Sequence, residues 1–232
     1  MDRQHTNTAR YDIYRNIHRA IRAFMGDTLS VIGSIDAGDS DDLQVGLQQL
    51  HELLDLCDAH IEKETHFVHA AMERRRPGSS ARIADEHIDH AELIQALREL
   101  AERVGREESP IMRNSLLQRL YAQLALFVAD NFEHMHVEDT EHSAVLWADF
   151  TDAELAEIEG AIVASIPPIE AAVVFRWMLP NIDHTARVEL LSGVRQGAPR
   201  EVFEGFLGMA QAHLSARDWQ KLSAALQLAQ AA

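Results

Sequence analysis

The chain is poor in cysteine, and it lacks any long run of apolar residues. Cys57 is the single cysteine among 232 residues, so the sequence allows neither an internal disulfide nor a metal cluster built on thiolates. No window approaches the roughly 18 consecutive apolar residues of a membrane-spanning helix, and the first residues contain no apolar stretch of signal-peptide length. These absences predict a cytoplasmic protein in which any metal is held by nitrogen and oxygen atoms.

Basic residues are scarce relative to acidic ones. The 21 Lys and Arg residues stand against 37 Asp and Glu residues, which gives a formal net charge of −16 at pH 7. A charge of that sign repels nucleic-acid phosphates and anionic membrane surfaces, so we expect neither nucleic acid nor a membrane as a partner. Association of identical copies into a homo-oligomer is left open by the sequence.

Sustained alternation of β-branched and polar residues, which is typical of a half-buried strand, is missing too. Apolar residues instead recur at helical spacing, which predicts an all-α fold. Four long helices with short connections favour an up-down-up-down four-helix bundle over residues 1–148, followed by a helical C-terminal extension over residues 149–232. The approximate ranges of the long helices are 9–35, 43–73, 81–104 and 111–142.

The predicted extension contains several signals for the start of a helix. Thr151 with Glu154 resembles a capping box. Asp183 precedes the next apolar run, and Ser215 with Asp218 indicates a further start. Breaks at proline and glycine delimit helices of about three turns. The sequence assigns no role to this extension.

Histidines and glutamates occupy the apolar faces of the four predicted long helices. A lone histidine on an apolar face is more often a hydrogen-bonded core residue than a ligand, but an inward histidine repeated on all four helices favours a metal site. Two of the helices also carry a glutamate one turn after the histidine. The candidate metal ligands are His18, His60, Glu64, His87, His134 and Glu138.

The charge of the two glutamates points in the same direction. An ionised carboxylate in a helical core costs several kcal/mol unless a positive charge compensates it. Two carboxylates and four imidazoles are too many for one closed tetrahedral site, but they suit two metal ions that share the carboxylates and keep an open coordination position. Iron or manganese suits this mixture of ligands better than magnesium does.

These residues and their spacing resemble the hemerythrin-like HHE cation-binding domain over about residues 11–147. The resemblance implies a four-helix bundle with a non-haem diiron centre of the Fe–O–Fe or Fe–OH–Fe type, with manganese or zinc as substitutes. It also implies that Glu64 and Glu138 bridge the irons. The terminal ligands that the resemblance implies are His18, His60, His87 and His134. The matching segments are Asn16-Ile-His-Arg, His60-Ile-Glu-Lys-Glu64, Asp85-Glu-His87-Ile-Asp-His90 and Phe132-Glu-His134-Met-His-Val-Glu138.

The chain departs from the oxygen-carrying hemerythrins at two ligand positions. Those proteins place a second histidine four residues after the first on the third helix, where this chain has Ala91, and His90 is an alternative. They also place an aspartate five residues after the fourth-helix histidine, a spacing that Asp139 occupies. On a regular helix Glu138 lies about 40° from His134 and Asp139 about 140°, so Glu138 is preferred unless a π-bulge intervenes.

The remaining polar residues near the predicted ligands receive plainer interpretations. Tyr14, one turn before His18, is interpreted as a packing residue, and Arg22, one turn after it, as an exposed one. His184 is interpreted as part of a helix terminus. The other histidines off the ligand faces are predicted to lie at the surface or behind the ligands; they are His51, His66, His69, His136, His142 and His213.

Three functions follow from this pattern. The first is a diiron protein that binds or senses dioxygen, peroxide or a related small oxidant at the open position. The second is a diiron peroxidase or oxygenase that acts on a substrate held between the bundle and residues 151–232. The third is a metal-free helical interaction module.

Overall fold

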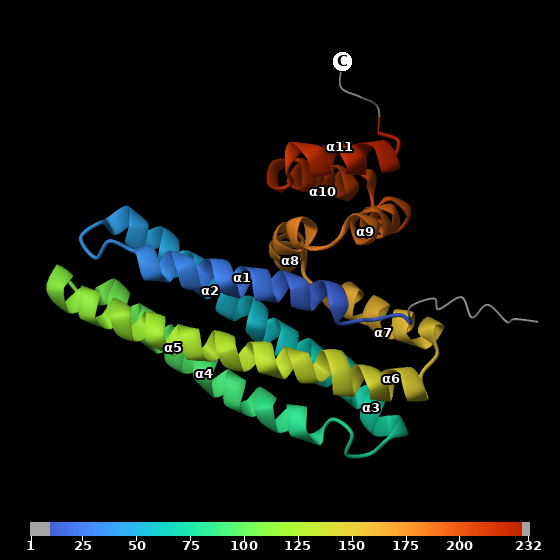
Figure 1. Ribbon diagram of the computed structural model, residues 1–232, viewed down its shortest axis with the longest axis horizontal. Coiled ribbons are helices and arrows are strands. Elements are labelled where there is room, and N and C mark those ends of the chain that lie inside the picture. Colours follow the sequence, from blue (N-terminus) through green and yellow to red (C-terminus); the bar gives the residue numbers. More distant parts are fainter. Residues whose placement is uncertain (1–9, 229–232) are drawn as a thin grey trace, which may run out of the picture.

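The computed structural model describes residues 10–228, and every regular element in that range is a helix. Four of these helices are long, namely α1 (Arg15–Ser34), α2 (Ser40–Lys63), α4 (Ala81–Arg106) and α5 (Pro110–Val137). They lie side by side, with α1 and α4 each packed against both α2 and α5 (Figure 1). The predicted all-helical fold class is confirmed.

The first helix begins later than the sequence predicts. We expected it from about residue 9, which lies outside the described residues, but α1 begins at Arg15. The Asp12 carboxylate accepts hydrogen bonds from the backbone N–H groups of Tyr14 and Arg15, both at 3.1 Å, and so forms a turn just before the helix. A turn stabilised by its own side chain competes with helix formation at these residues.

The chain stays helical beyond the last residues of α2 and α5. Each continues through a π-helical segment, η1 (Glu64–His69) after α2 and η2 (Glu138–His142) after α5. Two short helices follow these segments directly, α3 (Ala70–Arg75) after η1 and α6 (Ser143–Asp149) after η2. The continuous helical segment formed by α5, η2 and α6 therefore extends past the end that the sequence predicts near residue 142. Such π-helical segments are rare and are found mostly at functional sites, and here each begins with a predicted ligand carboxylate.

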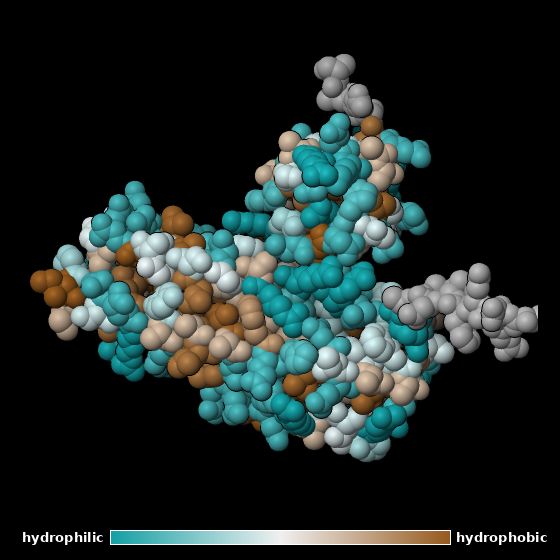
Figure 2. Space-filling view, viewed as in Figure 1, coloured by the Kyte–Doolittle hydropathy of each residue, from teal (hydrophilic) through white to brown (hydrophobic). Residues whose placement is uncertain are grey.

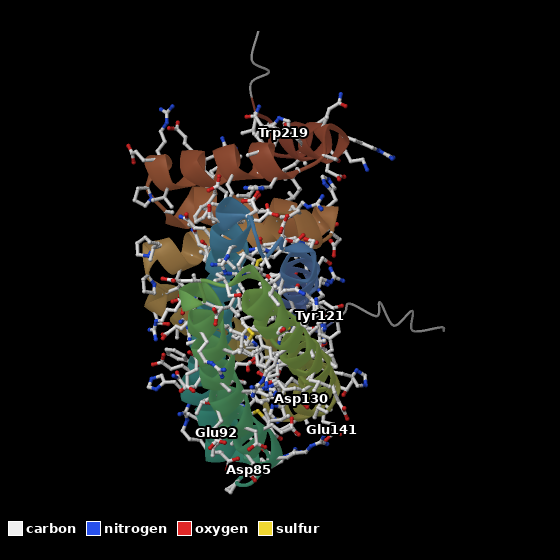
Figure 3. All side chains as sticks on the ribbon, turned by 90° about the vertical axis from the view of Figure 1, so that its left-hand side faces the viewer. Asp85, Glu92, Tyr121, Asp130, Glu141 and Trp219 are labelled. Carbon is white, nitrogen blue, oxygen red and sulfur yellow. The ribbon has the colours of Figure 1, made fainter. Side chains whose placement is uncertain are left out.

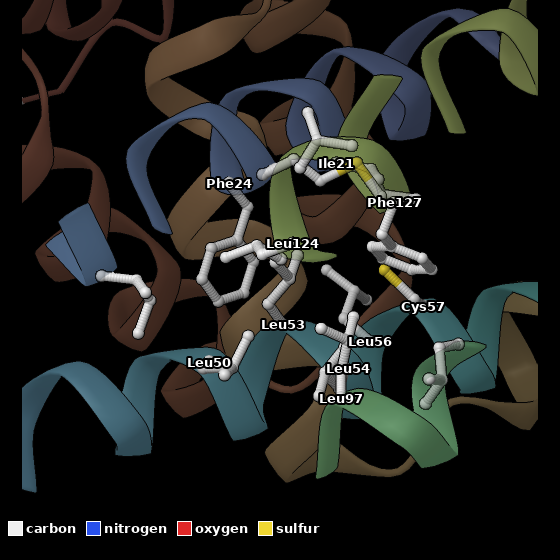
Figure 4. Packing of buried hydrophobic residues seen from close by; sticks show 14 of the residues in the cluster. Ile21, Phe24, Leu50, Leu53, Leu54, Leu56, Cys57, Leu97, Leu124 and Phe127 are labelled. Atoms are coloured by element: carbon white, nitrogen blue, oxygen red, sulfur yellow. The ribbon is translucent and has the colours of Figure 1, made fainter. Parts of the chain in front are cut away.

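The core of the four long helices is apolar along most of their length. Figure 4 shows residues such as Phe24, Leu53, Leu124 and Phe127 meeting between the helices, all of them buried. Cys57 is 2% exposed in this core, and burial raises the pKa of its thiol to about 12. The thiol therefore stays protonated at neutral pH and is a packing group rather than a metal ligand.

The second part of the chain consists of shorter helices. They are α7 (Asp152–Ser165), α8 (Pro168–Asn181), α9 (His184–Gly197), α10 (Arg200–His213) and α11 (Ala216–Ala225). All three predicted helix starts are confirmed. Thr151 and Glu154 form a reciprocal capping box, Asp183 accepts from the N–H of Ala186, and Ser215 accepts from the N–H of Asp218.

These short helices join the rest of the chain in different ways. Helix α8 packs along α1, where Trp177 stacks on Phe24 with ring centroids 4.2 Å apart, and its apolar side chains enter the core of the long helices. Helix α9 also adds Ala186 to this core, whereas α10 and α11 stand away from the long helices (Figure 1). Helices α8 to α11 share a second apolar cluster around Leu179, Leu191 and Phe203. Among the described residues, we find no helix with both the length and the apolar character needed to span a membrane.

Candidate metal centre

The long helices bring all six predicted ligands into one buried cluster. One residue comes from the start of α1 and one from α4, while His60 with Glu64 and His134 with Glu138 lie where α2 and α5 pass into their π-helical segments. Five of the six are at most 4% exposed, and the His60 side chain is 13% exposed. The cluster lies at the end of the apolar core, away from the loop that joins α1 to α2.

Two overlapping groups of donors make up this cluster. In the first group, the Nε2 atoms of His18 and His60 lie 3.5 and 3.2 Å from Glu64 Oε1. The Nε2 atom of His18 also lies 3.4 Å from Glu138 Oε2. The donor atoms of His18, His60, Glu64 and Glu138 are all within 4.8 Å of one another.

The second group uses the same two carboxylates. The Nε2 atom of His87 lies 3.5 Å from Glu64 Oε2 and 3.9 Å from Glu138 Oε1. The Nε2 atom of His134 lies 3.4 Å from Glu138 Oε2. These four residues also satisfy the 4.8 Å limit, so Glu64 and Glu138 lie between two pairs of histidines.

Unsatisfied polar atoms in the cluster fit a bound metal. Both oxygens of Glu64 and of Glu138 are buried without a hydrogen-bond partner among the described residues, as are the Nε2 atoms of His18, His60 and His87. An unpartnered buried polar atom costs about 1–3 kcal/mol, and an unpaired buried charge costs more. Metal ions that accept these lone pairs would remove the cost.

The ionisation of the two glutamates supports the same interpretation. Burial and the negative charge of Glu64 raise the pKa of Glu138 well above its ordinary value. Burial also acts to raise the pKa of Glu64, but His60, His18 and His87 outweigh it, and the net shift is well below the ordinary value. The chain alone therefore keeps one carboxylate charged and the other neutral, whereas added cations would let both ionise.

Two of the four histidines, His60 and His134, present neutral rings to the carboxylates, whereas at His18 the hydrogen bonds to Asp139 and Glu64 outweigh burial and raise the pKa above its ordinary value. Burial lowers the pKa of both His60 and His134 to about 4, so their rings are neutral at physiological pH. A neutral imidazole keeps the lone pair that binds a metal. His60 and His134 therefore hold the protonation state that a metal site of nitrogen and oxygen donors needs.

Three of the histidines are fixed from behind by hydrogen bonds at Nδ1. The Nδ1 atom of His18 lies 2.7 Å from Asp139 Oδ1, and that of His134 lies 2.9 Å from Glu86 Oε2. The Nδ1 atom of His87 lies 2.9 Å from Thr65 Oγ1. A carboxylate partner accepts a hydrogen bond from the Nδ1–H group, which leaves the lone pair of Nε2 free to face the cluster, as is typical of metal-binding histidines.

The structure places both alternative ligands outside the cluster. His90 is buried, but its Nε2 atom pairs at 2.8 Å with the exposed Asp130, which is labelled in Figure 3. Asp139 turns one oxygen toward His18 and pairs the other with Arg22 Nη2 at 2.7 Å. The interpretation of Arg22 as simply exposed is therefore wrong, because the negative charge of Asp139 draws its half-buried side chain into an ion pair.

Two buried histidines beside the cluster were not predicted as donors. His69 and His142, which we expected at the surface or behind the ligands, are each 4% exposed and end the two π-helical segments. Their donor atoms lie within 4.8 Å of each other and of Glu138. Neither ring nitrogen of His69 has a hydrogen-bond partner among the described residues, and its ring stacks on His87 with centroids 4.9 Å apart.

The position of His69 depends on the π-helix. On a regular helix a residue five positions after Glu64 points about 140° away from it, whereas i→i+5 hydrogen bonding widens the turn and returns that residue to the same side. The spacing of His142, four residues after Glu138, was a signal that sequence reasoning could have used. The remaining histidines among residues 10–228 lie outside the cluster. His51 is partly buried, and the exposed ones are His66, His136, His184 and His213.

Comparison with known proteins agrees with this geometry. The chain is 22% identical over 193 residues to zinc finger protein BRUTUS-like from Arabidopsis thaliana, and the match covers 79% of this chain but 15% of that protein. No solved structure matches the chain. The model of the hemerythrin HHE cation binding domain matches residues 9–143, which is more than half of the chain. The chain therefore belongs to the hemerythrin HHE cation-binding family.

Proposed function

We propose that the chain holds two iron ions between the two pairs of histidines and binds dioxygen, peroxide or a related small oxidant there. The observation that carries this proposal is the sharing of Glu64 and Glu138 by both groups of donors. Two shared carboxylates with two terminal imidazoles on each side leave each metal short of six ligands. The family, and the mutual packing of the four long helices, favour the up-down-up-down arrangement in which hemerythrin-like sites are built.

The residues of the chain have defined parts in this proposal. A reduced pair of irons, when bound, supplies two electrons to a small oxidant. Glu64 and Glu138 offset the positive charge of the ions, and the apolar core beside them keeps bulk water away. Asp139 and Glu86 hold His18 and His134 in the tautomer that binds metal, and Thr65 orients the ring of His87.

Metal analysis combined with optical spectra tests this function. We expect about two irons per chain in the protein purified without added metal, and an absorption band that changes reversibly between air and reducing, oxygen-free conditions. A His90→Ala variant, which alters a buried histidine outside the cluster, should keep both the metal and the band. Purification with two zinc ions and no iron, or with no metal, would contradict the proposal.

A second candidate is a peroxidase or oxygenase that uses the same metals. It is favoured by a cavity that reaches His60 and Glu64 from the side of the short helices. Its signature is turnover, namely consumption of peroxide or of an organic substrate that stops in a Glu64→Ala variant that remains folded. A metal-free interaction module has less support, because it leaves the buried donor atoms of the cluster without a partner.

A further inference from the structure

A cavity of about 630 Å³ lies between the metal-centre end of the long helices and the short helices α7, α8, α9 and α10. Its volume is within the range of about 300–1,000 Å³ that is usual for small-molecule sites. Figure 2 shows the surface hollowed between the α9–α11 helices and the long helices. The cavity wall is mainly apolar, with Ile17, Val174, Met178, Val163, Ile166 and Leu190 among its residues.

The cavity ends at one side of the metal centre. His60 and Glu64 line it, and so does Tyr14, whose ring stacks on His18 with centroids 5.0 Å apart. His87 and His134 are not among its lining residues. A molecule in the cavity would thus meet the metal position beside α1 and α2 and not the one beside α4 and α5.

The charged side chains of the cavity either have a partner already or are acidic and would repel a bound anion. The Nζ atom of Lys63 forms an ion pair with Glu170 at 2.7 Å, so the positive charge of Lys63 is already compensated. The Glu159 carboxylate accepts a hydrogen bond from the Tyr11 hydroxyl, and burial raises its pKa, which favours its neutral form. Glu189 is an exposed acidic group of the wall. A fatty-acid carboxylate would find no free cation here, and an ammonium group would find no free buried carboxylate apart from Glu64.

We propose that this cavity binds a neutral, predominantly hydrophobic small molecule and presents it to the metal position beside His60. An apolar wall favours such a molecule because burying its surface gains about 25 cal/mol per Å². The chemical fate of the bound molecule rests on the proposed function, but its binding does not. The cavity would therefore supply the substrate for an oxidising centre or the signal molecule for a sensor.

Glycines in the cavity wall offer a direct way to fill it. A Cβ atom added at Gly160 of α7 or Gly193 of α9 would meet no atom within 4 Å, so larger side chains there can extend into open space. Leucine is also a better helix former than glycine by several tenths of a kcal/mol, so the filled variants should fold. Gly205 of α10 has equally open surroundings and does not line the cavity, which makes it a matched control.

Binding of the neutral fluorescent probe Nile red to the full-length protein as purified tests the proposal. We expect saturable binding at one site, and displacement by dodecanol at concentrations at least about tenfold lower than for dodecanoate or dodecylammonium. The double variant Gly160→Leu/Gly193→Leu should weaken probe binding by about tenfold or more, whereas Gly205→Leu should leave it unchanged. Equal binding by the filled variant, no saturable binding by the wild type, or preferred displacement by either charged amphiphile would overturn the proposal.

A parallel metal measurement separates this proposal from the function of the centre. Probe binding in a preparation without iron would support ligand binding in the cavity and contradict the diiron function. Bound iron without probe binding would support the diiron function and contradict ligand binding in the cavity. Since His60 lines the cavity, dodecanol should also shift the metal absorption band of the wild type. The same addition should leave the band of the Gly160→Leu/Gly193→Leu variant unchanged.

Discussion

The two histidine pairs of the metal centre share both carboxylates but have different surroundings. The α1–α2 position, with His18 and His60, borders the apolar cavity. The α4–α5 position, with His87 and His134, borders two further buried histidines, His69 and His142. One position is thus open to an incoming molecule, and the other has additional donors within reach. Under the proposed two-metal function, this comparison predicts unequal tasks for the two positions, ligand exchange at one and a structural role at the other.

Loss of a shared carboxylate should produce the largest effect, because it removes a donor from both positions. We expect Glu138→Ala and Glu64→Ala to reduce the metal content from about two ions per chain to nearly none. The helical fold should survive, since each variant also removes a buried carboxyl group that has no hydrogen-bond partner among the described residues. Elemental analysis together with far-ultraviolet circular dichroism measures both effects.

A neighbouring glutamate provides the control for that experiment. Glu62 lies two residues before Glu64, in the last turn of α2, but is exposed, so Glu62→Ala should retain the full metal content. Retention of both ions by Glu138→Ala would show that the two positions do not share this carboxylate, and the comparison between them would then lose its basis.

Loss of one terminal histidine should affect one position only. His87→Ala is expected to lower the metal content from about two ions to about one, because the α1–α2 position keeps His18, His60 and both carboxylates. His90→Ala should lower it hardly at all, since His90 pairs with Asp130 instead. Metal analysis of the two variants side by side distinguishes them, and a greater loss in His90→Ala would reverse our assignment of the third-helix ligand.

Removal of the groups that orient the histidines should have smaller and position-specific effects. Asp139→Asn weakens the anchor of His18, and Glu86→Gln weakens that of His134. Such partners typically contribute 10- to 100-fold in metal affinity, and we expect losses of about that size. Chelator competition should show the α1–α2 position weakened in the first variant and the α4–α5 position in the second. Equal weakening of both positions in each variant would mean that the pair responds as one unit.

The sequence predicts the ligands on both sides of the centre but not the groups that surround them. Helical periodicity is enough to place His60 with Glu64 and His134 with Glu138 on inward faces, because these pairs lie one regular turn apart. It fails for His69, whose direction depends on a local π-helix that no propensity rule foresees. The partner of Arg22 was missed for a related reason, since Asp139 is distant in the sequence and meets it only after folding. The cavity likewise depends on how α7 to α10 pack, which short-range patterns do not specify.

The smallest predicted effect concerns the spare histidines of the α4–α5 position. Neither buried ring nitrogen of His69 has a partner within residues 10–228, and burial lowers the pKa of this histidine to about 4. In protein stripped of metal, His69→Leu should therefore raise the free energy of unfolding by about 1–3 kcal/mol, the usual cost of an unsatisfied buried polar group. The gain should be larger at pH 5 than at pH 7.5, because an unfolded histidine binds a proton below about pH 6.5 while the buried one resists it, so the wild type loses stability as the pH falls.

The same variant tests whether His69 donates to the second metal. If it does, His69→Leu should weaken the α4–α5 position several-fold in chelator competition and leave the α1–α2 position unchanged, even though the metal-free protein has become more stable. A gain in the stability of the metal-free protein together with a loss of metal affinity is expected only if His69 binds the metal and does not contribute to packing. A metal-free variant that is less stable than the wild type, together with unchanged affinity at both positions, would make His69 a packing residue and remove much of the difference between the two positions.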